Sequence, residues 1–418
     1  MTTQNTESGP FSGVRVLELA DEKGQWCGKL LGDLGADVIK IEPPDGEDTR
    51  TVGPFYKDVD DPERSLSFWH YNTSKRGVTL NLEADDGRAL FRRLIATADV
   101  VLETFRPGYI ASLGLGYDDL KKLNPSVIVC SLTPFGQTGP WRDFETSDLL
   151  HLAAGGQMGS CGYDDIPDAP PIAPGGGQAW HMGSHYACMA ITAALIHRAN
   201  SGLGQYIDVS VHESCALTTE GAMSAWIYTG KTMIRQTGRH AGVAPTPPTQ
   251  TLCKDGKYVN IQLIAMRLPP RQLRSLAEWM DKYDMADDLM DEKYQDTAVI
   301  QQQADHISLT VRKFINNMTR DEVYRGAQEL GFSWGAVRTH DELLDDGQLN
   351  DRGFWVRVDN PELGETFTYP GTSAIWSESP WQIARRAPLL GEHNQEIFCD
   401  ELDLSQAELT ALSENGVL

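Results

Sequence analysis

The chain has 418 residues, of which 40% are hydrophobic and 23% are charged, a composition typical of globular proteins. This length suits two or three domains with sizeable cores. The formal net charge of −23 disfavours nucleic acid and anionic membrane surfaces as partners. An anionic substrate would therefore need a local group of cations.

The sequence carries no sign of a membrane span or of an oxidising compartment. It has no run of about 18 apolar residues, and residues 1–13 lack the apolar core of a secretory signal. The seven cysteines are scattered and form no CxxC pair, which argues against a zinc site or a disulfide framework. We therefore expect a cytoplasmic protein.

The N-terminal stretch has the pattern of a strand–helix–strand unit. Residues 14–19 and 38–41 are predicted strands, and residues 26–34 between them a helix. The intervening turn reads ADEKGQ rather than GxGxxG, so a dinucleotide site is not predicted. Lys23 in this turn either meets a phosphate or is an ordinary surface lysine.

The alternation of strands and helices continues after a polar loop. The predicted strands are 78–82, 100–103 and 127–132, the predicted helices are 85–98 and 117–123, and the loop is 43–64. This order favours an α/β fold with a doubly wound, mostly parallel, Rossmann-like sheet. Residues 104–108 follow a strand directly, and ligands bind at the carboxyl ends of strands in such sheets.

A glycine run leads into an apolar helix at residues 174–198, PGGGQAWHMGSHYACMAITAALIHR. Small or apolar residues occupy nearly every face, so we expect this helix to be buried in a core. Glycines 175–177 would let backbone and ligand approach closely, or form a tight turn only. No carboxylate occurs between Asp168 and Asp208. Apolar and polar residues alternate over 207–211, which predicts a half-buried strand.

The second half of the chain reads as a smaller α+β domain after the Pro-rich stretch 238–250. A hairpin is predicted at 252–263, around Asp255-Gly256. The predicted helices are 272–280, 299–315 and 321–330, followed by strands at 354–358 and 366–369 and a helix at 389–398.

The candidate metal and acid sites in the sequence are weak. His181 and His185 have helical ligand spacing but lack the glutamate of HExxH, so no metal is expected. Asp164, Asp165 and Asp168 lie in a Pro/Gly-rich stretch that favours a solvated loop over a catalytic pair. The chain has no GxSxG motif and no P-loop.

Several motifs together resemble the class III coenzyme A transferases, the family that includes formyl-CoA transferase, carnitine CoA-transferase and α-methylacyl-CoA racemase. They are GVRVLEL at 13–19, LGADVIKIEPP at 34–44, NTSKRGVTLNL at 72–82, ETFRPG at 103–108, LGLGYDDL at 113–120, NPSVIVCSLTPFGQTGP at 124–140, GQYIDVSVHE at 204–213, CKDGKYVNI at 253–261 and APLLGEH at 387–393. Each is weak alone, but their common order over nearly the whole chain is specific.

The resemblance implies two protomers threaded through each other as interlocked rings. It implies a large domain from residues 1–200 to which residues 336–418 return, a linker at 201–240 and a small domain at 241–335. A coenzyme A thioester would be a substrate, with no permanently bound cofactor. The implied coenzyme A contacts are Lys23, Gly24, Leu80, Asn81, Thr104, Phe105 and Arg106, with a further set at Ser112 and residues 145–148.

The family's chemistry uses an aspartate that attacks the acyl thioester, and this chain lacks one at the implied position. The corresponding window contains Gln178, Ala179, Trp180 and His181, and Asp148 is a supporting candidate only. An amide or an indole cannot form an acyl anhydride in that role.

Two further departures concern cations near the coenzyme A phosphates. Glu83 stands where members often carry a lysine, and Ser112 where they often carry an arginine. Both changes weaken phosphate binding, unless Lys75, Arg76 or Arg142 compensates.

We therefore expect a subunit that pairs with a homologous subunit carrying the catalytic aspartate, and that takes part in moving coenzyme A from an acyl-CoA such as succinyl-CoA to a carboxylic acid. One alternative is an active chain that uses another carboxylate, Asp148 or Asp168. Another is a non-enzymatic acyl-CoA-binding or scaffold protein.

Overall fold

The computed structural model describes residues 9–261 and 268–418. The chain divides into two compact units. The first comprises Met1–Gln157, Pro174–Thr219 and Gly347–Leu418, and the second Met158–Ala173 and Glu220–Asp346. Residues 1–8, which belong to the stretch expected to lack a secretory signal, lie outside the described residues.

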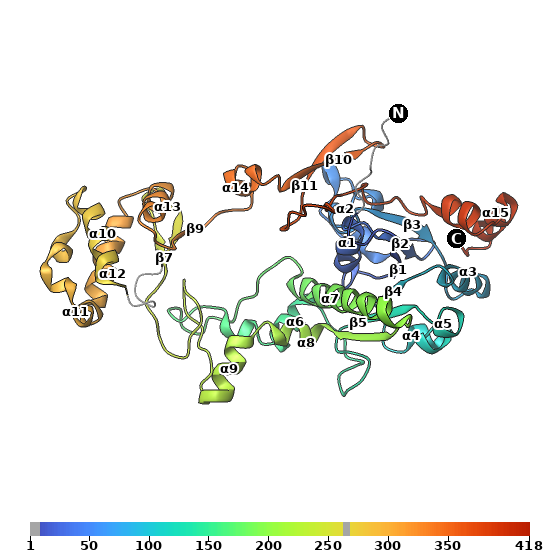
Figure 1. Ribbon diagram of the computed structural model, residues 1–418, viewed down its shortest axis with the longest axis horizontal. Coiled ribbons are helices and arrows are strands. Elements are labelled where there is room, and N and C mark those ends of the chain that lie inside the picture. The colour runs from blue at the N-terminus through green and yellow to red at the C-terminus, as the bar shows by residue number, and fades with distance from the viewer. Residues whose placement is uncertain (1–8, 262–267) are drawn as a thin grey trace. The chain divides into compact units, whose positions relative to one another are not determined.

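The first unit is built on a six-stranded parallel sheet (Figure 1). Its strands are β1 (Arg15–Leu19), β2 (Asp37–Glu42), β3 (Lys75–Thr79), β4 (Val100–Glu103), β5 (Ile128–Thr133) and β6 (Tyr206–Ser210). They pair in the order β3-β2-β1-β4-β5-β6, which confirms the predicted Rossmann-like sheet. The strand order reverses between β1 and β4, and ligands bind at the carboxyl ends of strands at such a point.

Helices cover both faces of the sheet. On one face Leu17, Ile39 and Val101 form a core with Phe91 of α3 (Asp85–Ile95) and Leu120 of α5 (Tyr117–Leu123). On the other face α1 (Gln25–Asp33) packs against α7 (Gln178–Ser201), and α7 packs on β5 and β6. The N-terminal ends of α1 and α7 are thereby held near the carboxyl edge of the sheet.

Strand β3 is shifted from its prediction at residues 78–82. It begins at Lys75 because both charges at its start are paired: Lys75 Nζ lies 2.8 Å from a Glu18 carboxylate oxygen, and Arg76 pairs with Asp37. Burial lowers the pKa of Lys75 to about 8, against the opposing influence of Glu18. Neither cation is available to a phosphate, so neither compensates for Glu83 or Ser112.

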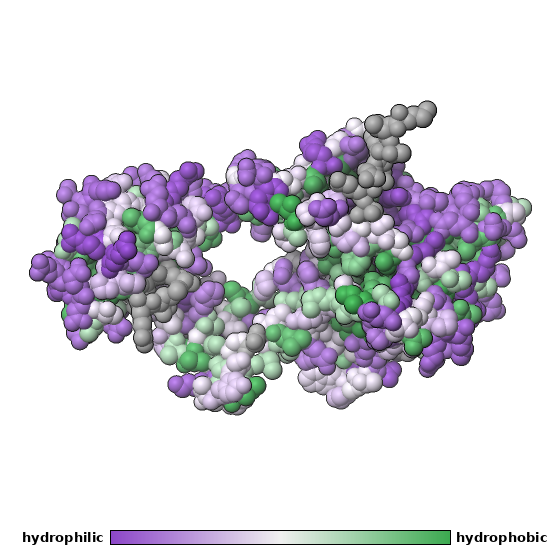
Figure 2. Space-filling view, in the orientation of Figure 1, coloured by the Kyte–Doolittle hydropathy of each residue, from purple (hydrophilic) through white to green (hydrophobic). Residues whose placement is uncertain are grey.

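The expectation that α7 is buried on nearly every face is wrong. Its buried residues, among them Ala187, Ile191 and Ala194, follow one stripe that faces α1, α8 (Val211–Leu217) and the sheet. Met189 and Ile196 are both 62% exposed. Figure 2 shows hydrophobic side chains at the surface over this helix.

The C-terminal segment completes the first unit. Hydrogen bonds from Ser74 N–H to Arg385 C=O and from Asn81 N–H to Val417 C=O tie it to the residues on either side of β3. The strands predicted at 354–358 and 366–369 are present with slightly shifted ends. They are β10 (Trp355–Asn360) and β11 (Glu365–Pro370), which pair as a hairpin. The helix predicted at 389–398 is a π-helix, Gln395–Glu401, because residues 390–393 form a turn.

The first unit also contains shorter elements. The predicted loop at 43–64 contains the 3₁₀ turns η1 (Asp48–Thr51), η2 (Tyr56–Asp58) and η3 (Pro62–Arg64). The other helices are α2 (Leu66–Tyr71), α4 (Tyr109–Ser112), α6 (Asp148–Ala154), α14 (Gly347–Asp351) and α15 (Gln406–Glu414). Of the expected linker at 201–240, β6 and α8 lie inside the first unit.

The second unit has the predicted α+β composition. Its helices are α9 (Glu220–Thr229), α10 (Pro270–Asp281), α11 (Thr297–Gln302), α12 (Ala304–Ile315) and α13 (Arg320–Glu329), and its sheet is β7 (Gln250–Leu252), β8 (Tyr258–Asn260) and β9 (Gly335–Ala336). β7 and β8 form the hairpin around Asp255-Gly256, whereas residues 262–263 of its predicted range lie outside the described residues. No helix in the described part of the chain could cross a membrane.

The contact between α1 and the sheet leaves no room at Gly28. A Cβ there would lie 1.5 Å from Glu18 Oε2 and 3.1 Å from Lys75 Nζ. We predict that Gly28→Ala lowers the free energy of unfolding by about 3 kcal/mol, because overpacking also disturbs this buried ion pair. Gly347→Ala, where a Cβ meets nothing within 4 Å, is the matched control. Equal urea-unfolding midpoints for the two variants would contradict this packing.

Candidate functional site

The turn between β1 and α1 lies at the carboxyl edge of the sheet and is fixed to the end of β4. Asp21 N–H donates to Thr104 Oγ1 at 3.0 Å, and Thr104 Oγ1 donates back to Asp21 Oδ1 at 2.9 Å. Gly24 permits this approach, because a Cβ there would lie 2.7 Å from Thr104 Cγ2. Within this turn Glu22 lines one cavity and Lys23 lines another.

The cavity at Lys23, here called the Lys23 groove, has a volume of about 180 Å³. Its lining brings together six of the predicted coenzyme A contacts, Lys23, Thr104, Phe105, Arg106, Glu145 and Thr146. The remaining lining residues are Pro107, Pro134, Arg142, Asp143 and Phe144. The groove therefore combines aromatic surface with three cations.

Each cation of the Lys23 groove already has a carboxylate partner. Lys23 pairs with Asp21, and Arg106 pairs with Glu145. Arg142 Nε lies 3.2 Å from Asp143 Oδ1. A phosphate entering the groove would have to compete with these carboxylates, which weakens its binding.

The other sequence-predicted contacts lie outside the lining of the groove. Leu80 is buried in the core at 2% exposure. Asn81 faces the C-terminal tail, where its Nδ2 donates to Gly416 C=O at 3.3 Å. Glu83 and Ser112 both contact Tyr109, through bonds of 3.1 Å to its hydroxyl and 2.7 Å to its carbonyl. The Tyr109 ring packs on Phe105, so both positions border the groove.

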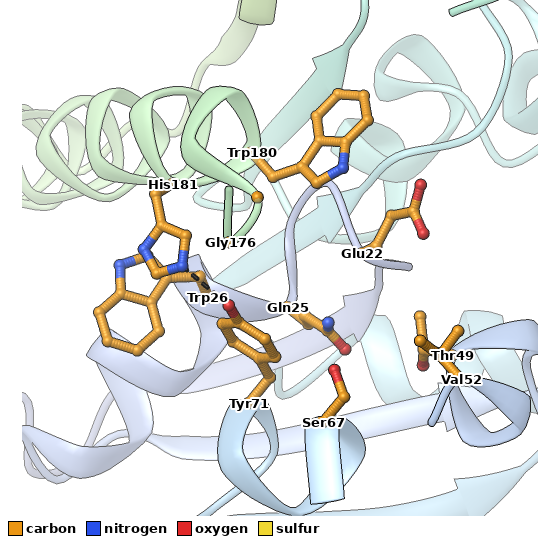
Figure 3. Close-up of a pocket in the computed structure, with 11 residues that line it drawn as sticks. Glu22, Gln25, Trp26, Thr49, Val52, Ser67, Tyr71, Gly176, Trp180 and His181 are labelled. Carbon is orange, nitrogen blue, oxygen red and sulfur yellow. Dashed lines mark hydrogen bonds between the residues drawn. The ribbon is translucent and has the colours of Figure 1, made fainter. Parts of the chain in front are cut away.

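The cavity at Glu22, here called the Trp180 pocket, has a volume of about 260 Å³ and lies at the start of α7 (Figure 3). It is lined by Glu22, Gln25, Trp26, Thr49, Val52, Ser67, Tyr71, Gly176, Gly177, Trp180 and His181. Gly176 and Gly177 have φ values of 89° and 68°, so the glycine run supplies a left-handed turn that lets the backbone form part of the wall.

The first turn of α7 has no carboxylate of its own but receives one from α6. Asp148 Oδ1 accepts the Ala179 N–H at 2.7 Å, and Ser147 caps the helix that carries Asp148. The sequence window from Gln178 to Trp180 is therefore flanked in space by Asp148 and by Glu22 of the pocket. The sequence analysis did not predict Glu22 as a site residue. Its position next to Lys23, in the turn between the first strand and the first helix, could have indicated it.

An aromatic and histidine cluster forms one wall of the Trp180 pocket. The Tyr71 hydroxyl and His181 Nε2 are 2.8 Å apart, and the Trp26 and His181 rings lie 4.7 Å apart. His185 Nδ1 bonds to the His181 carbonyl at 2.7 Å. Both helical histidines thus have structural partners. Among the described residues, the group with metal-ligand spacing is Asp287, Asp288 and His306, in the second unit.

The acidic stretch predicted as a solvated loop is structured within the second unit. Asp164 Oδ1 accepts the Thr237 N–H at 2.8 Å and Oδ2 accepts from Arg239 at 2.6 Å. Asp168 has a φ of 59°, so it serves as a left-handed turn residue.

His151 is buried behind Trp180 and was not anticipated as a site residue. Its ring lies 5.3 Å from Trp180 and 5.0 Å from Phe135, and neither ring nitrogen has a hydrogen-bond partner among the described residues. Burial, then His212 and Lys23, lowers the pKa of His151 to about 4. The ring is therefore neutral at physiological pH.

This burial makes His151 a source of acid sensitivity. The pKa of His151 is about 4 in the folded state and roughly 6.5 in the unfolded state. The neutral buried ring therefore contributes fully to stability above the unfolded-state pKa. This contribution is lost as the pH falls from the unfolded-state pKa to the folded-state pKa. We predict that His151→Phe flattens the decline of melting temperature between pH 6.5 and 4. The part due to His70, His181 and His393 remains, because their pKa values are also lowered. The exposed His197→Phe is the control. An unchanged pH profile in His151→Phe would contradict this assignment.

Comparisons with known proteins agree with this geometry. Residues 11–394 match the model of CoA-transferase family III. The chain is 34% identical to succinyl-CoA:(R)-benzylsuccinate CoA-transferase subunit BbsE of Thauera aromatica, over 93% of this chain and 94% of that protein. It is 34% identical to succinate–glutarate CoA-transferase of Agrobacterium fabrum, over 96% and 98% of the two chains.

Two further relatives extend the similarity. The succinyl-CoA–L-malate CoA-transferase beta subunit of Chloroflexus aurantiacus is 32% identical over 99% of both chains. The crystal structure of a CAIB/BAIF family protein from Brucella suis is 30% identical with a TM-score of 0.78, covering 96% of this chain and all of that one. The match to the family model, the relatives and the shared fold lead to one conclusion: the chain belongs to CoA-transferase family III.

Proposed function

We propose that this chain is the subunit of a heteromeric CoA-transferase that lacks the nucleophilic aspartate and supports a homologous catalytic subunit. The observation that carries the proposal is the start of α7, where Gln178, Ala179 and Trp180 offer no carboxylate. The donor would be an acyl-CoA, with succinyl-CoA favoured by the relatives, and the acceptor a carboxylic acid. No permanently bound cofactor takes part, and the complex would act in the cytoplasm.

The relatives support a partner subunit. BbsE is named as a subunit, and the malate enzyme of Chloroflexus aurantiacus has both an alpha and a beta subunit similar to this chain. The chain also exposes apolar side chains that a partner would cover, including Met189 and Ile196 on α7 and, in the second unit, Trp226 and Ile227 on α9. These surfaces favour an assembly over a free monomer.

The chemistry would take place on the aspartate of the partner. Its carboxylate oxygen attacks the thioester carbonyl carbon, the C–S bond breaks and the coenzyme A thiolate leaves. The thiolate then attacks the aspartyl carbonyl and displaces the donor acid, which leaves an aspartyl thioester. The acceptor carboxylate attacks this thioester, the C–S bond breaks, and a second mixed anhydride forms as the thiolate leaves. The thiolate then attacks the acceptor's carbonyl carbon, which releases the new acyl-CoA and the free aspartate carboxylate.

A second candidate function has a specific observation in its favour. Glu22 projects into the Trp180 pocket, and Asp148 lies at the start of α7, so this chain holds two carboxylates near the expected position. Partial burial raises the pKa of Glu22 above its usual value, with Asp21 and Asp148 adding to the effect. In this alternative the chain is active by itself, with Glu22 or Asp148 as nucleophile.

Reconstitution separates the two candidates. We predict that the purified chain transfers no coenzyme A between succinyl-CoA and added acids, whereas the complex with its homologous subunit does. In the complex, Glu22→Gln and Asp148→Asn in this chain would each leave turnover within about tenfold of wild type, while loss of a nucleophile costs about a thousandfold or more. Normal turnover by the isolated chain would overturn the proposal.

The Lys23 groove generates a separate prediction about coenzyme A itself. Restoring both family cations, by Glu83→Lys with Ser112→Arg, should tighten coenzyme A binding by about tenfold at low salt, since each change adds positive charge near Phe105 and Arg106. Glu378→Lys with Ser377→Arg, at exposed positions outside the groove, makes the same change in net charge and is the control. Equal affinities of the control and the double variant by calorimetry would show that the groove does not hold the phosphates.

A further inference from the structure

Two cysteines that are far apart in the sequence lie against each other where α1 packs on α7. The Ser184 hydroxyl donates to the Lys23 carbonyl at 2.9 Å, which fixes the register of the two helices near their starts. Cys188 and Cys27 each lie four residues beyond their member of this contact, so they follow one turn later on the same faces. The two thiols are accordingly hydrogen-bond partners across the helix interface.

The two thiols differ in their surroundings. Cys27 is buried at 0% exposure, whereas Cys188 is partly exposed. The hydrogen bond that Cys27 donates is the largest influence on Cys188 and lowers its pKa, although burial acts in the opposite direction. The same bond, together with burial, raises the pKa of Cys27. Cys188 is therefore the thiol that a dissolved oxidant can reach and that more readily forms a thiolate.

A third cysteine lies near the pair but is poorly placed to react. Cys130 belongs to β5, on which α7 packs, and it is buried at 0% exposure. Burial, then Glu103 and Asp208, raises the pKa of Cys130 well above its usual value. Cys130 therefore stays a protonated thiol, and the pair of Cys27 and Cys188 is the reactive part of this cluster.

We propose that Cys27 and Cys188 form a reversible modification site, at which hydrogen peroxide oxidises the two thiols to a disulfide that joins α1 to α7. The Cys188 thiolate attacks one peroxide oxygen, the O–O bond breaks, and the leaving hydroxide takes up the proton that Cys188 had released. The Cys27 sulfur then attacks the sulfur of the resulting sulfenic acid, the S–O bond breaks, and water leaves with the Cys27 proton. The two sulfurs lose two electrons in total, which reduce the peroxide to water.

The disulfide would act on the carboxyl edge of the sheet, where both helices begin. A covalent bond between the sulfurs is shorter than a hydrogen bond between them, so α1 and α7 would approach each other at this turn. The contact of Ser184 with Lys23 lies one turn away, and Lys23 lines the Lys23 groove. A disulfide of this kind in a reducing compartment is transient and serves in redox sensing. The proposal concerns the covalent state of this chain and does not depend on which subunit performs coenzyme A transfer.

The test is peptide mass mapping of the native full-length chain, with its partner subunit present where the two co-purify. The protein is exposed to hydrogen peroxide, the remaining thiols are alkylated in denaturant, and linked peptides are measured before and after dithiothreitol. A pair joined through Cys27 and Cys188 is expected at about tenfold or more above any other pair, and dithiothreitol should separate it. Both thiols still free, or Cys188 linked instead to Cys130 or to a second chain, overturns the proposal.

Variants assign the chemistry to the two positions. In Cys27→Ala, Cys188 should remain as a sulfenic acid that dimedone traps, because its partner thiol is missing. In Cys188→Ala, the buried Cys27 should be oxidised at least about tenfold more slowly. Cys399→Ala, at a partly exposed cysteine outside the pair, is the matched control and should leave the disulfide unchanged. Melting temperatures establish that each variant is folded, and oxidation of Cys27 at the wild-type rate in folded Cys188→Ala overturns the proposal.

Discussion

The hydrogen bond from Ala179 N–H to Asp148 is the contact around which the site is arranged. It satisfies one of the amides that a helix leaves unpaired at its start, and it places a carboxylate against the positive end of a 24-residue helix. Because α7 packs against α1 and the sheet, this contact connects the glycine run, the carboxyl edge and the aromatic wall. A carboxylate is thus present at the expected place, but it comes from α6 and is engaged by the backbone.

The first βα turn separates two cavities of opposite electrostatic character. Lys23, Arg106 and Arg142 line the groove on one side, each paired with a carboxylate, while Glu22 faces the Trp180 pocket on the other. Thr104 holds the turn in place through both of its bonds to Asp21. In the proposed function, the lack of a cation at Glu83 and Ser112 and the ion pairs within the groove act in the same direction. Both would weaken the attraction of this chain for the phosphates of coenzyme A.

Local patterns in the sequence were sufficient to predict the sheet, but they did not show which charged side chains are buried or paired. The alternation of apolar strands and amphipathic helices predicts the parallel sheet. The family resemblance implies that Thr104, Phe105 and Arg106 lie near Lys23, and the four residues line one groove. The start of β3 was missed because Lys75 is buried. Its charge is stabilised there by Glu18, which is far from it in the sequence. The exposed stripe on α7 was missed because sequence periodicity cannot show whether an apolar face is covered. Glu22, Tyr71 and His151 come from three separate segments, and their neighbourhood exists only in the folded chain.

The central claim is that acyl groups are never covalently held by this chain. Hydroxylamine or borohydride trapping during turnover of the complete complex, followed by peptide mass mapping, tests it most directly. The account predicts that the modified carboxyl group lies on an aspartate of the homologous subunit, with this chain unlabelled. A label on Glu22, Asp148 or Asp168 of this chain would contradict it.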